Sequence, residues 1–527
     1  MQYPGFIFGA NESQAFSADQ QRTINWYVET TQAPGAPARA ALLPTPGVEL
    51  VGDTYVAGAT PAQPDRAHFF ESGREFAVIG ATFYEIDEGG ALTSRGTVTK
   101  DVNPATISSN GDAGGQLLIC SGTNAYYYVL STNVLTQITG MDGLATMGDF
   151  LDGYGLILDA ATSTLYVSAL ADMSSWTPGT NFTRRSVASD PWVAMKVLGR
   201  YVWLLGSQTS EAWYNAGGLF PLALHPSSLV RYGCAAPWSV GVAEQSIFWL
   251  GASRLGEGFV VEAQGFTPRV VSSFAVQNDI NKLGRIDATQ GDVYIDRGHT
   301  FYLLSFIGGK KTWAYDLTEQ IWAERGTWIA EDSEWVSWRP RWHAQAFGET
   351  RWLDGETGQV WQSSPDFYAD VTRKRAGSSI PEAITNGPAG GIATFIASAR
   401  PLRRLRRAPA IYAEQERIFY SSFEVELESG KGLPGVFADK YGNVVGRPDP
   451  QVMMRLSNDG GKTWSAESWV SAGKIGEYQA RAKWYRMGQA RRRVFEISVT
   501  DPIPWTITNA YLKLGQQPKV GMSNAGR

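Results

Sequence analysis

The stretch GQLLICSGTNAYYYVLSTNVLTQITG, residues 115–140, contains the pattern that decides the fold of most of the chain. An aliphatic run at residues 117–120 leads into a polar turn at Gly122, and an aromatic run follows at residues 125–130. Short apolar runs separated by Gly and Asn are typical of antiparallel strands joined by a tight turn. The stretch therefore predicts a β-hairpin.

The same order of strand, turn and strand returns from about residue 55 to residue 364. Seven leading strands are expected, at intervals of 38 to 54 residues. They start near Glu75, Gln116, Tyr154, Tyr201, Ser246, Thr300 and Arg351. A period of this length in a chain of short strands is typical of β-propeller blades, and because one blade cannot bury both of its faces, neighbouring blades must stack in a ring. We predict an all-β fold with a β-propeller of about seven blades over residues 55–364. The last repeat is short, and the N-terminal segment is a candidate to complete it.

The composition of the chain changes after residue 364. Residues 365–399 are rich in Gly, Pro, Ser and Asn, which predicts a linker or long loop. Residues 400–517 contain alternating strands and predict a second domain that resembles a β-sandwich, with a flexible tail at 518–527. Residues 1–54 are expected to pack outside the propeller and to join it to this second domain.

Charge is divided unequally between the two parts of the chain. Residues 371–527 hold 24 Lys and Arg against 13 Asp and Glu, whereas residues 1–370 hold 22 against 38. The net charges are therefore +11 and −16. This asymmetry indicates a domain boundary near residue 370 and different partners for the two parts.

A run of arginines, ARPLRRLRRAPA, opens the C-terminal part. It contains Arg400, Arg403, Arg404, Arg406 and Arg407. The ordinary explanation is a solvated strand or loop. The other explanation is a docking patch, because guanidinium groups bind carboxylates and phosphates through paired hydrogen bonds. We predict a solvent-facing patch that docks a protein partner.

The segment SNDGGKTW, residues 457–464, resembles the Asp-box that recurs in sialidases. The residues that match its pattern are Ser457, Asp459, Gly461, Thr463 and Trp464. Ser and Asp side chains can hydrogen-bond the backbone of their own loop, Gly accepts a positive φ, and a Trp can anchor the hairpin on a core. We predict a structural turn. A sialidase would also need an arginine triad, a tyrosine nucleophile with a glutamate partner and usually several Asp-boxes, whereas this sequence shows one box and no Arg-Ile-Pro signature near its start.

Other kinds of chemistry find little support in the sequence. Isolated acids such as Glu211, Asp316 and Glu324 do not gather with His and Arg as an active site requires. The four histidines lack metal-ligand spacing, and the two cysteines, Cys120 and Cys234, are too far apart in sequence to suggest a disulfide framework. No secretory signal and no run of about 18 apolar residues is visible. We expect no catalytic residue, metal, cofactor or membrane span.

Three further stretches carry a resemblance to a known family. They are DQQRTINWYVE (19–29) with LLPTPGVEL (42–50), then SEAWYNAGGLFPLA, YGCAAPWSV and FWLGASRLGEGFV between 210 and 260, and finally WYRMGQARRRVFEISVTDPIPWTITNAYLKL (484–514). In this order the chain resembles the packaged-DNA stabilisation proteins of short-tailed bacteriophages (podoviruses), also called tail hub or nozzle proteins. The resemblance spans nearly the whole chain.

The resemblance implies a virion protein without enzymatic activity, assembled in the host cytoplasm and located in the tail. It implies a homo-oligomeric ring, commonly a hexamer, below the portal-adaptor ring, which extends the DNA channel, retains the packaged double-stranded DNA until ejection and offers a surface to a tailspike, fibre or tail needle. The unequal division of charge agrees with such a channel. An acidic lumen lets DNA slide, whereas basic residues would bind the DNA phosphates and hold it. The basic C-terminal domain would then dock on an acidic neighbour such as the adaptor ring.

Two alternatives stay open. One is a sialidase-like propeller that binds or hydrolyses glycans, as the Asp-box and the 19 Trp residues suggest. The other is a monomeric scaffold propeller that binds peptides.

Overall fold

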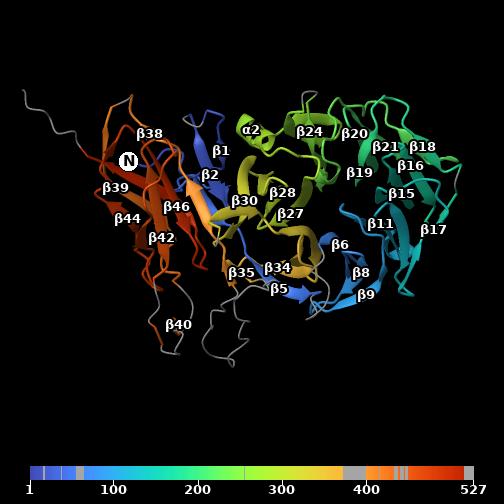
Figure 1. The fold of residues 1–527 in the computed structure, drawn as a ribbon, viewed down its shortest axis with the longest axis horizontal. Helices are drawn as coiled ribbons and strands as arrows, with labels where there is room; N and C mark the ends of the chain where they lie inside the picture. The colour runs from blue at the N-terminus through green and yellow to red at the C-terminus, as the bar shows by residue number, and fades with distance from the viewer. Residues whose placement is uncertain are drawn as a thin grey trace, which may run out of the picture.

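Two β domains lie side by side along the long axis of the molecule (Figure 1). The computed structural model describes residues 1–515 apart from 16–17, 37, 55–63, 178, 254–255, 331, 372–398, 415, 433–436, 439–443 and 446–448. Helices within this part are limited to α1 (Gly111–Gly114), α2 (Phe274–Lys282) and the 3-10 turn η1 (Pro237–Ser239). The predicted all-β fold is confirmed. Most of the expected linker and the tail at 518–527 lie outside the described residues.

The larger domain is a propeller, and its first four blades are antiparallel meanders. Blade one contains β6 (Asp65–Glu71), β7 (Arg74–Ile79), β8 (Thr82–Ile86) and β9 (Leu92–Thr97). Blade two contains β10 (Thr106–Ser109), β11 (Gln116–Ser121), β12 (Asn124–Val129) and β13 (Val134–Gln137). Blade three contains β14 (Met147–Leu151), β15 (Tyr154–Asp159) and β16 (Thr164–Ala169), with β17 (Asp172–Trp176) and β18 (Phe182–Arg184) both beside β16. Blade four contains β19 (Trp192–Leu198), β20 (Tyr201–Gly206), β21 (Ser210–Asn215) and β22 (Leu222–Leu224).

Three more blades complete the ring. Blade five contains β23 (Gly241–Ala243), β24 (Ser246–Ala252), β25 (Gly258–Gln264) and β26 (Thr267–Val270). Blade six contains β27 (Gln290–Asp296), β28 (His299–Phe306), β29 (Lys311–Asp316) and β30 (Ile321–Ile329), with β31 (Glu334–Ser337) beside β30. Blade seven contains β32 (Pro340–Ala346), β33 (Glu349–Asp354) and β34 (Gln359–Ser363), and its outer strand is β5 (Val48–Asp53).

The N-terminal segment therefore closes the propeller, because β5 pairs antiparallel with β34. The expectation that all of residues 1–54 pack outside the ring is wrong for this strand. Closure is also made by side chains, since Arg351 of β33 donates to the fully buried Glu75 of β7 at 2.6 Å, which joins the last blade to the first. The first strands of the seven blades neighbour one another in order, and β32 lies next to β6.

The leading strands expected from the sequence repeats are the second strands of the blades. The first strand of each blade lines the axis of the ring and falls outside the predicted repeat units. The second strands are the most apolar: β11, β20 and β24 are almost completely buried. Strands buried on both faces read as continuous apolar runs, so they carry the strongest signal in the sequence.

The smaller domain is a sandwich of two sheets. One sheet contains β3 (Trp26–Thr30), β4 (Ala40–Pro44), β47 (Ile507–Leu514), β39 (Ile418–Leu427) and β44 (Ala482–Tyr485), with β45 (Gln489–Ala490) beside β39. The other contains β2 (Gln20–Ile24), β37 (Arg404–Arg407), β46 (Arg492–Val499), β42 (Gln451–Ser457) and β43 (Ser468–Ser471), with β1 (Asn11–Glu12) beside β2 and β38 (Ile411–Tyr412) beside β46. Two short pairs lie outside these sheets: β36 (Ala399–Pro401) pairs with β35 (Ala369–Val371), which extends blade seven, and β40 (Phe437–Ala438) pairs with β41 (Val444–Val445).

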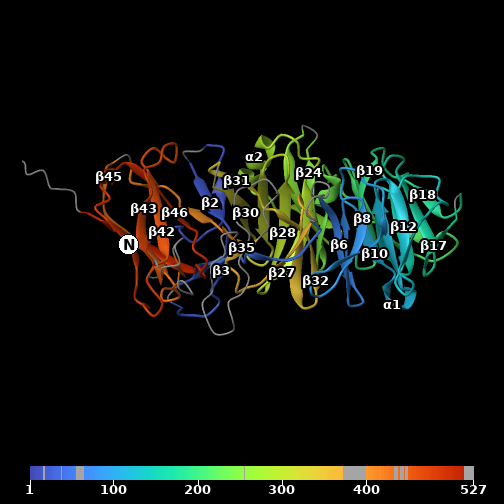
Figure 2. The ribbon, with the colours of Figure 1, turned by 60° about the horizontal axis from the view of Figure 1, so that its bottom comes forward.

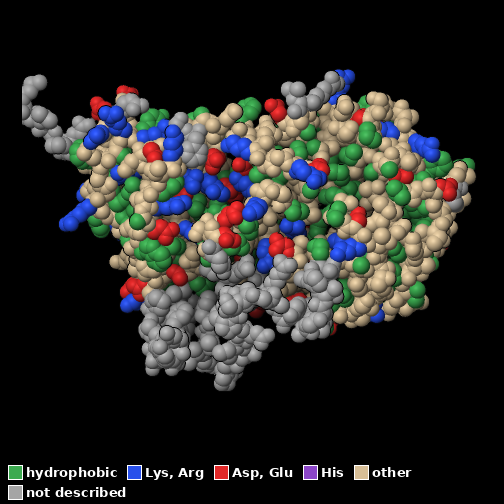
Figure 3. All heavy atoms as spheres, in the orientation of Figure 1, with side chains coloured by type: hydrophobic (Ala, Val, Ile, Leu, Met, Phe, Trp, Pro, Cys, Tyr) green, Lys and Arg blue, Asp and Glu red, His purple; other side chains and the backbone are tan. Residues whose placement is uncertain are grey.

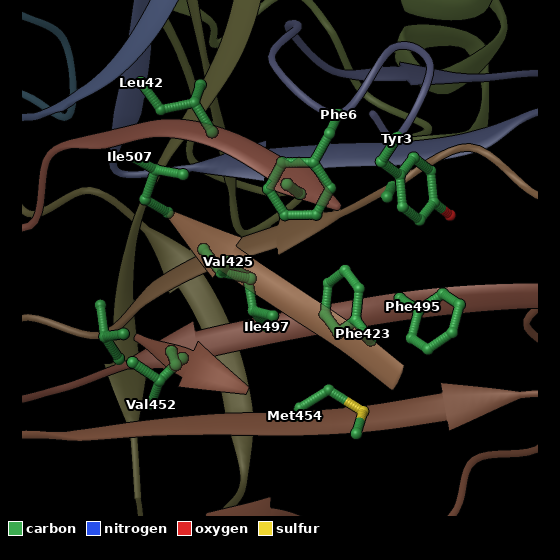
Figure 4. Close-up of a cluster of buried hydrophobic side chains, with 14 of the residues drawn as sticks. Tyr3, Phe6, Leu42, Phe423, Val425, Val452, Met454, Phe495, Ile497 and Ile507 are labelled. Atoms are coloured by element: carbon green, nitrogen blue, oxygen red, sulfur yellow. The ribbon is translucent and has the colours of Figure 1, made fainter. Parts of the chain in front are cut away.

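The core of the sandwich draws on both ends of the chain. The centroid of the Tyr3 ring lies 6.1 Å from that of Phe423 and 6.0 Å from that of Phe495. The Phe6 ring packs beside them, 5.5 Å from Tyr3 and 6.0 Å from Phe423. Figure 4 shows these rings facing one another between the strands, together with Leu42 from the N-terminal segment. The sandwich therefore cannot complete its core without residues that precede the propeller in sequence.

Candidate functional site: the joint between propeller and sandwich

The segment that contains β2 and β3 lies between the two domains and is hydrogen-bonded to both. On one side β2 pairs antiparallel with β37 of the sandwich, and on the other Ile24 pairs parallel with Glu324 of β30 in blade six. One twelve-stranded sheet thus runs from blade six into the sandwich. In Figure 2, β2 lies between β46 and β30. Because the sheet is continuous, the two domains form a single body.

Asn25 fixes the point where β2 ends and β3 begins. It is completely buried and has a φ of 59°, a left-handed conformation that Asn adopts more readily than most residues. Its amide nitrogen donates to the carbonyls of Gly326 in blade six at 2.9 Å and of Arg403 beside β37 at 2.8 Å. Its amide oxygen accepts from the Gly326 N–H at 3.1 Å. One side chain therefore joins blade six to the sandwich.

The two aromatic residues after Asn25 enter opposite cores. The Trp26 indole N–H donates to the Trp505 carbonyl at 2.8 Å inside the sandwich. Tyr27 packs on His299 and Phe301 of blade six, with centroid separations of 4.9 and 5.3 Å. Successive residues of a strand point to opposite faces, so this Trp-Tyr pair anchors the segment on both sides.

An ion pair on β2 faces the propeller. The Arg22 guanidinium donates two hydrogen bonds to the buried Glu324 carboxylate, at 2.9 and 2.6 Å, and the Lys311 ammonium lies 3.4 Å from the same group. Burial alone would raise the pKa of Glu324, but the two cations outweigh it and lower the pKa from 4.5 to about 2. The carboxylate is therefore held charged at the joint.

Arg406 of the predicted docking run is fully buried at the same joint. Its guanidinium donates to five oxygens of the N-terminal segment at 2.6 to 3.0 Å: the carbonyls of Gly5, Phe6 and Gly9, Gln21 Oε1 and Thr23 Oγ1. Burial lowers the pKa of Arg406 to about 9. The side chain therefore joins residues 5–23 of the N-terminal segment to β37 through hydrogen bonds.

The neighbouring arginines also form contacts within the protein. Arg404 is fully buried and donates to the Thr45 carbonyl at 2.9 Å, and burial lowers its pKa to about 9 against the opposing charge of Asp370. Arg403 lies over the Trp328 ring at 4.3 Å, and Arg407 donates to Glu496 at 2.8 Å.

The prediction of a solvent-facing docking patch is therefore wrong for Arg403, Arg404, Arg406 and Arg407. In Figure 3, Lys, Arg, Asp and Glu side chains gather where the two domains meet. Arg400 lies in β36, which pairs with β35, and its side chain is outside the described part of the chain. The density of positive charge in the sequence predicted an exposed surface. In the structure Arg404 and Arg406 are buried and donate hydrogen bonds to the N-terminal segment.

The Asp-box forms a closed network within its own turn. The Asp459 carboxylate accepts from the Ser457 hydroxyl at 2.6 Å, from the backbone N–H groups of Lys462 and Thr463 at 2.9 and 3.0 Å, and from the Thr463 hydroxyl at 2.6 Å. The hydrogen bonds from Ser457 and Thr463 hold the pKa of Asp459 well below its usual range. Gly461 donates to the Ser457 oxygen at 2.7 Å and has a φ of 96°.

Trp464 connects this turn to the arginine run. Its ring lies between Arg407 and Arg455, at 4.9 and 4.8 Å from the guanidinium carbons. Both arginines also bind the Glu496 carboxylate. The ring is half-buried rather than inserted in the core. We expect Trp464→Ala to cost about 1 to 2 kcal/mol, the worth of two such cation–π contacts, less than a buried Trp would.

We predict that Asp459→Ala loosens the turn without changing any catalysis. Four donors would lose their acceptor, so amide exchange at residues 458–464 should quicken while the blades keep their protection. Lys462→Ala is the matched control, because that side chain takes no part in the network. Glycosidase turnover by the wild type that disappears in Asp459→Ala would contradict a structural role for the box.

The acids singled out from the sequence do not converge. Glu211 lies in blade four and accepts from the indole groups of Trp192 and Trp213 at 3.1 and 3.2 Å. Asp316 and Glu324 lie in blade six, where Asp316 contacts His299 at 2.7 Å and Glu324 binds Arg22. Each is occupied by a local structural contact.

The axis of the propeller contains a cavity of about 580 Å³, lined by the first strands of the blades. Some polar groups on its wall are paired with one another, as where Asp292 accepts from the backbone N–H of His343 at 2.8 Å. A passage as wide as the major groove of B-DNA alone, about 12 Å, would use up this volume within about 5 Å of its length, which is less than the length of one blade strand. A DNA duplex therefore does not fit through this cavity.

The family comparison accounts for both domains. A family model described as the β-propeller of bacteriophage P22 Gp10 matches residues 2–359, and one described as its β-sandwich matches residues 403–515. The chain belongs to this family. The resemblance deduced from the sequence is confirmed, and the Gp10 family makes the chain a structural protein of a phage tail that stabilises packaged DNA. The propeller match begins at residue 2, in agreement with the part that the N-terminal segment takes in that domain.

Other comparisons are less informative. No curated protein matches the chain. Among solved structures, the N-terminal domain of Nup159 is 11% identical, with 65% of this chain and 98% of that chain covered and a TM-score of 0.38. BamB from Moraxella catarrhalis is also 11% identical, with coverages of 64% and 97% and a TM-score of 0.37. Likeness at this level carries no argument about function.

Sequence reasoning missed Arg22, Asn25 and Trp26 as joint residues. The signal that could have found them is the motif RTINWY itself, in which a turn-forming Asn interrupts a strand between an arginine and two aromatic residues.

Proposed function

We propose that this tail protein is the hub or nozzle subunit of a short phage tail. Six copies form a ring below the portal-adaptor ring and extend the DNA channel, and the two ends of the ring dock the adaptor on one side and a tailspike, fibre or tail needle on the other. The observation that carries the proposal is the joint, where a continuous sheet and buried arginines make one rigid body from two domains. A rigid body suits the wall of a channel that must hold packaged DNA.

The size of the axial cavity supports a DNA path outside the individual propellers. Because a duplex does not fit through this cavity, the channel lies between copies and is lined by their outer surfaces. We assign the lining to the acidic part, residues 1–370. A basic lining would replace the counterions of the phosphates and hold the DNA in a strongly salt-dependent way, whereas an acidic one lets it slide.

Assembly tests this proposal. We expect the purified chain, alone or with its adaptor ring, to form a species of six times the 57.6 kDa chain mass in analytical ultracentrifugation. Phage particles made without the chain should lose their DNA to added nuclease, and purified chain should restore protection. A chain that stays monomeric with the adaptor, and particles that keep their DNA without it, would contradict the proposal.

A further inference from the structure

Four cations without an ion-pair partner among the described residues gather at one end of the sandwich. They are Lys462, Arg486, Arg491 and Arg492, and we call this group the basic tip. The first three are exposed, whereas Arg492 is half-buried and its Nε lacks a hydrogen-bond partner. Figure 2 places β45, which lies between Arg486 and Arg491 in sequence, at the end of the sandwich away from the propeller.

Strand register brings these cations together. Ser457 at the end of β42 pairs with Val494 of β46, so the Asp-box turn lies beside Arg492, the first residue of β46. A Cβ on Gly460 of this turn would lie 3.8 Å from the Arg492 Nε. Arg492 also pairs across strands with Tyr412, which is 70% exposed.

The buried Arg493 holds the two turns of the basic tip in place. Its Nε donates to Asn458 of the Asp-box turn at 2.8 Å. Its other nitrogens donate to the carbonyls of Met487 and Gln489, in the turn that contains Arg486. Its guanidinium also lies over the Tyr420 ring at 4.4 Å. The Asp-box turn therefore forms one side of the basic tip.

Cations outnumber carboxylates at this surface. Asp459 lies in the Asp-box turn, and its oxygens accept the four hydrogen bonds described above. Glu414 and Glu416 lie in the loop between β38 and β39, which is beside the basic tip because Tyr412 pairs with Arg492 and Ile418 pairs with Ala490. Arginine and tyrosine on a preorganised surface are the residue types that protein interfaces favour, and a patch of unpaired cations selects an acidic partner.

We propose that the basic tip binds the acidic propeller of a second copy of this chain. Residues 1–370 carry −16 and residues 371–527 carry +11, so each copy presents both complementary charges. The continuous sheet holds the tip away from its own propeller, so the complement is available only from another copy. Such a head-to-tail contact generates a closed ring when its rotation closes. The inference rests on the ring of the proposed function and specifies one of its contacts.

Charge reversal tests the contact in the full chain. We expect Arg486→Glu, Arg491→Glu and Arg492→Glu together to weaken self-assembly at least tenfold in sedimentation experiments at low salt, while the melting curve stays close to that of the wild type. Wild-type assembly should weaken in the same direction when salt is raised. The matched control reverses Arg200 and Arg285, which are 82% and 81% exposed on the propeller and paired with their own aspartates. That control should assemble normally. A triple Arg→Gln variant, which adds no repulsion, provides the same test if the reversed chain misfolds.

Zero-length cross-linking identifies the partner directly. In a mixture of isotope-labelled and unlabelled copies, Lys462 should couple to Asp or Glu of residues 1–370 of a different copy. Unchanged assembly of the triple variant, or coupling of Lys462 only to another tail protein, would overturn the inference while leaving the ring intact. A wild type that forms no ring at all would instead count against the proposed function.

Discussion

Replacing Arg406 with Met is expected to release the first residues of the chain from the sandwich. The side chain of Arg406 is fully buried and donates to five oxygens of the N-terminal segment. Each buried acceptor left without a donor costs about 1 to 3 kcal/mol, although water reaches some of them once the segment moves. We expect the sandwich to lose about 3 to 5 kcal/mol of unfolding free energy, which is less than the sum over five acceptors because water satisfies some of them.

Hydrogen exchange and urea unfolding measure this loss. Amides of residues 1–12 should exchange much faster in Arg406→Met, because Tyr3 and Phe6 depend on the same segment for their place in the core. Arg406→Lys should lie between the two, since one ammonium cannot reach five oxygens. Arg285→Met, on an 81% exposed side chain, is the control and should change little. If Arg406→Met were as stable as the wild type, the run would be a solvated strand after all.

The second large effect is expected at Glu324, where it depends on pH. The folded protein holds the pKa of this carboxyl near 2, against 4.5 in the unfolded chain. Between these values the unfolded chain binds more protons, so the contribution of Glu324 is complete above about pH 4.5 and is lost as the pH falls toward 2. A difference of this size corresponds to about 3 kcal/mol.

Glu324→Gln should therefore remove a pH dependence as well as stability. At neutral pH the variant should be about 3 to 5 kcal/mol less stable at the joint, because Arg22 and Lys311 lose their shared counter-charge. Between pH 4.5 and 2.5 the gap between variant and wild type should shrink. Glu334→Gln is the control, because its pair with Lys310 is about half exposed and contributes little. A gap that stays constant with pH would show that Glu324 is not titrating as the geometry requires.

Local patterns in the sequence were enough to predict the architecture. Strand, turn and strand repeated seven times because each blade is built from neighbours in sequence, and the buried second strands are continuous apolar runs. The same holds for the Asp-box, where the hydrogen bonds to the Asp459 carboxylate all close within seven residues. What the repeats missed are the partly polar first strands around the axis, and β5, which pairs with β34 of blade seven across more than 300 residues of sequence.

The sequence by itself determined the two β domains, the number of blades and the division of charge, because these depend on composition and on contacts between near neighbours. Only the tertiary structure decided where the arginines go. Arg404 and Arg406 have the residue types of a surface patch, but their acceptors include carbonyls of Gly5, Phe6 and Thr45, which lie 359 to 401 positions earlier in the chain. No local pattern encodes such a contact, since it exists only once the N-terminal strands are laid between the propeller and the sandwich.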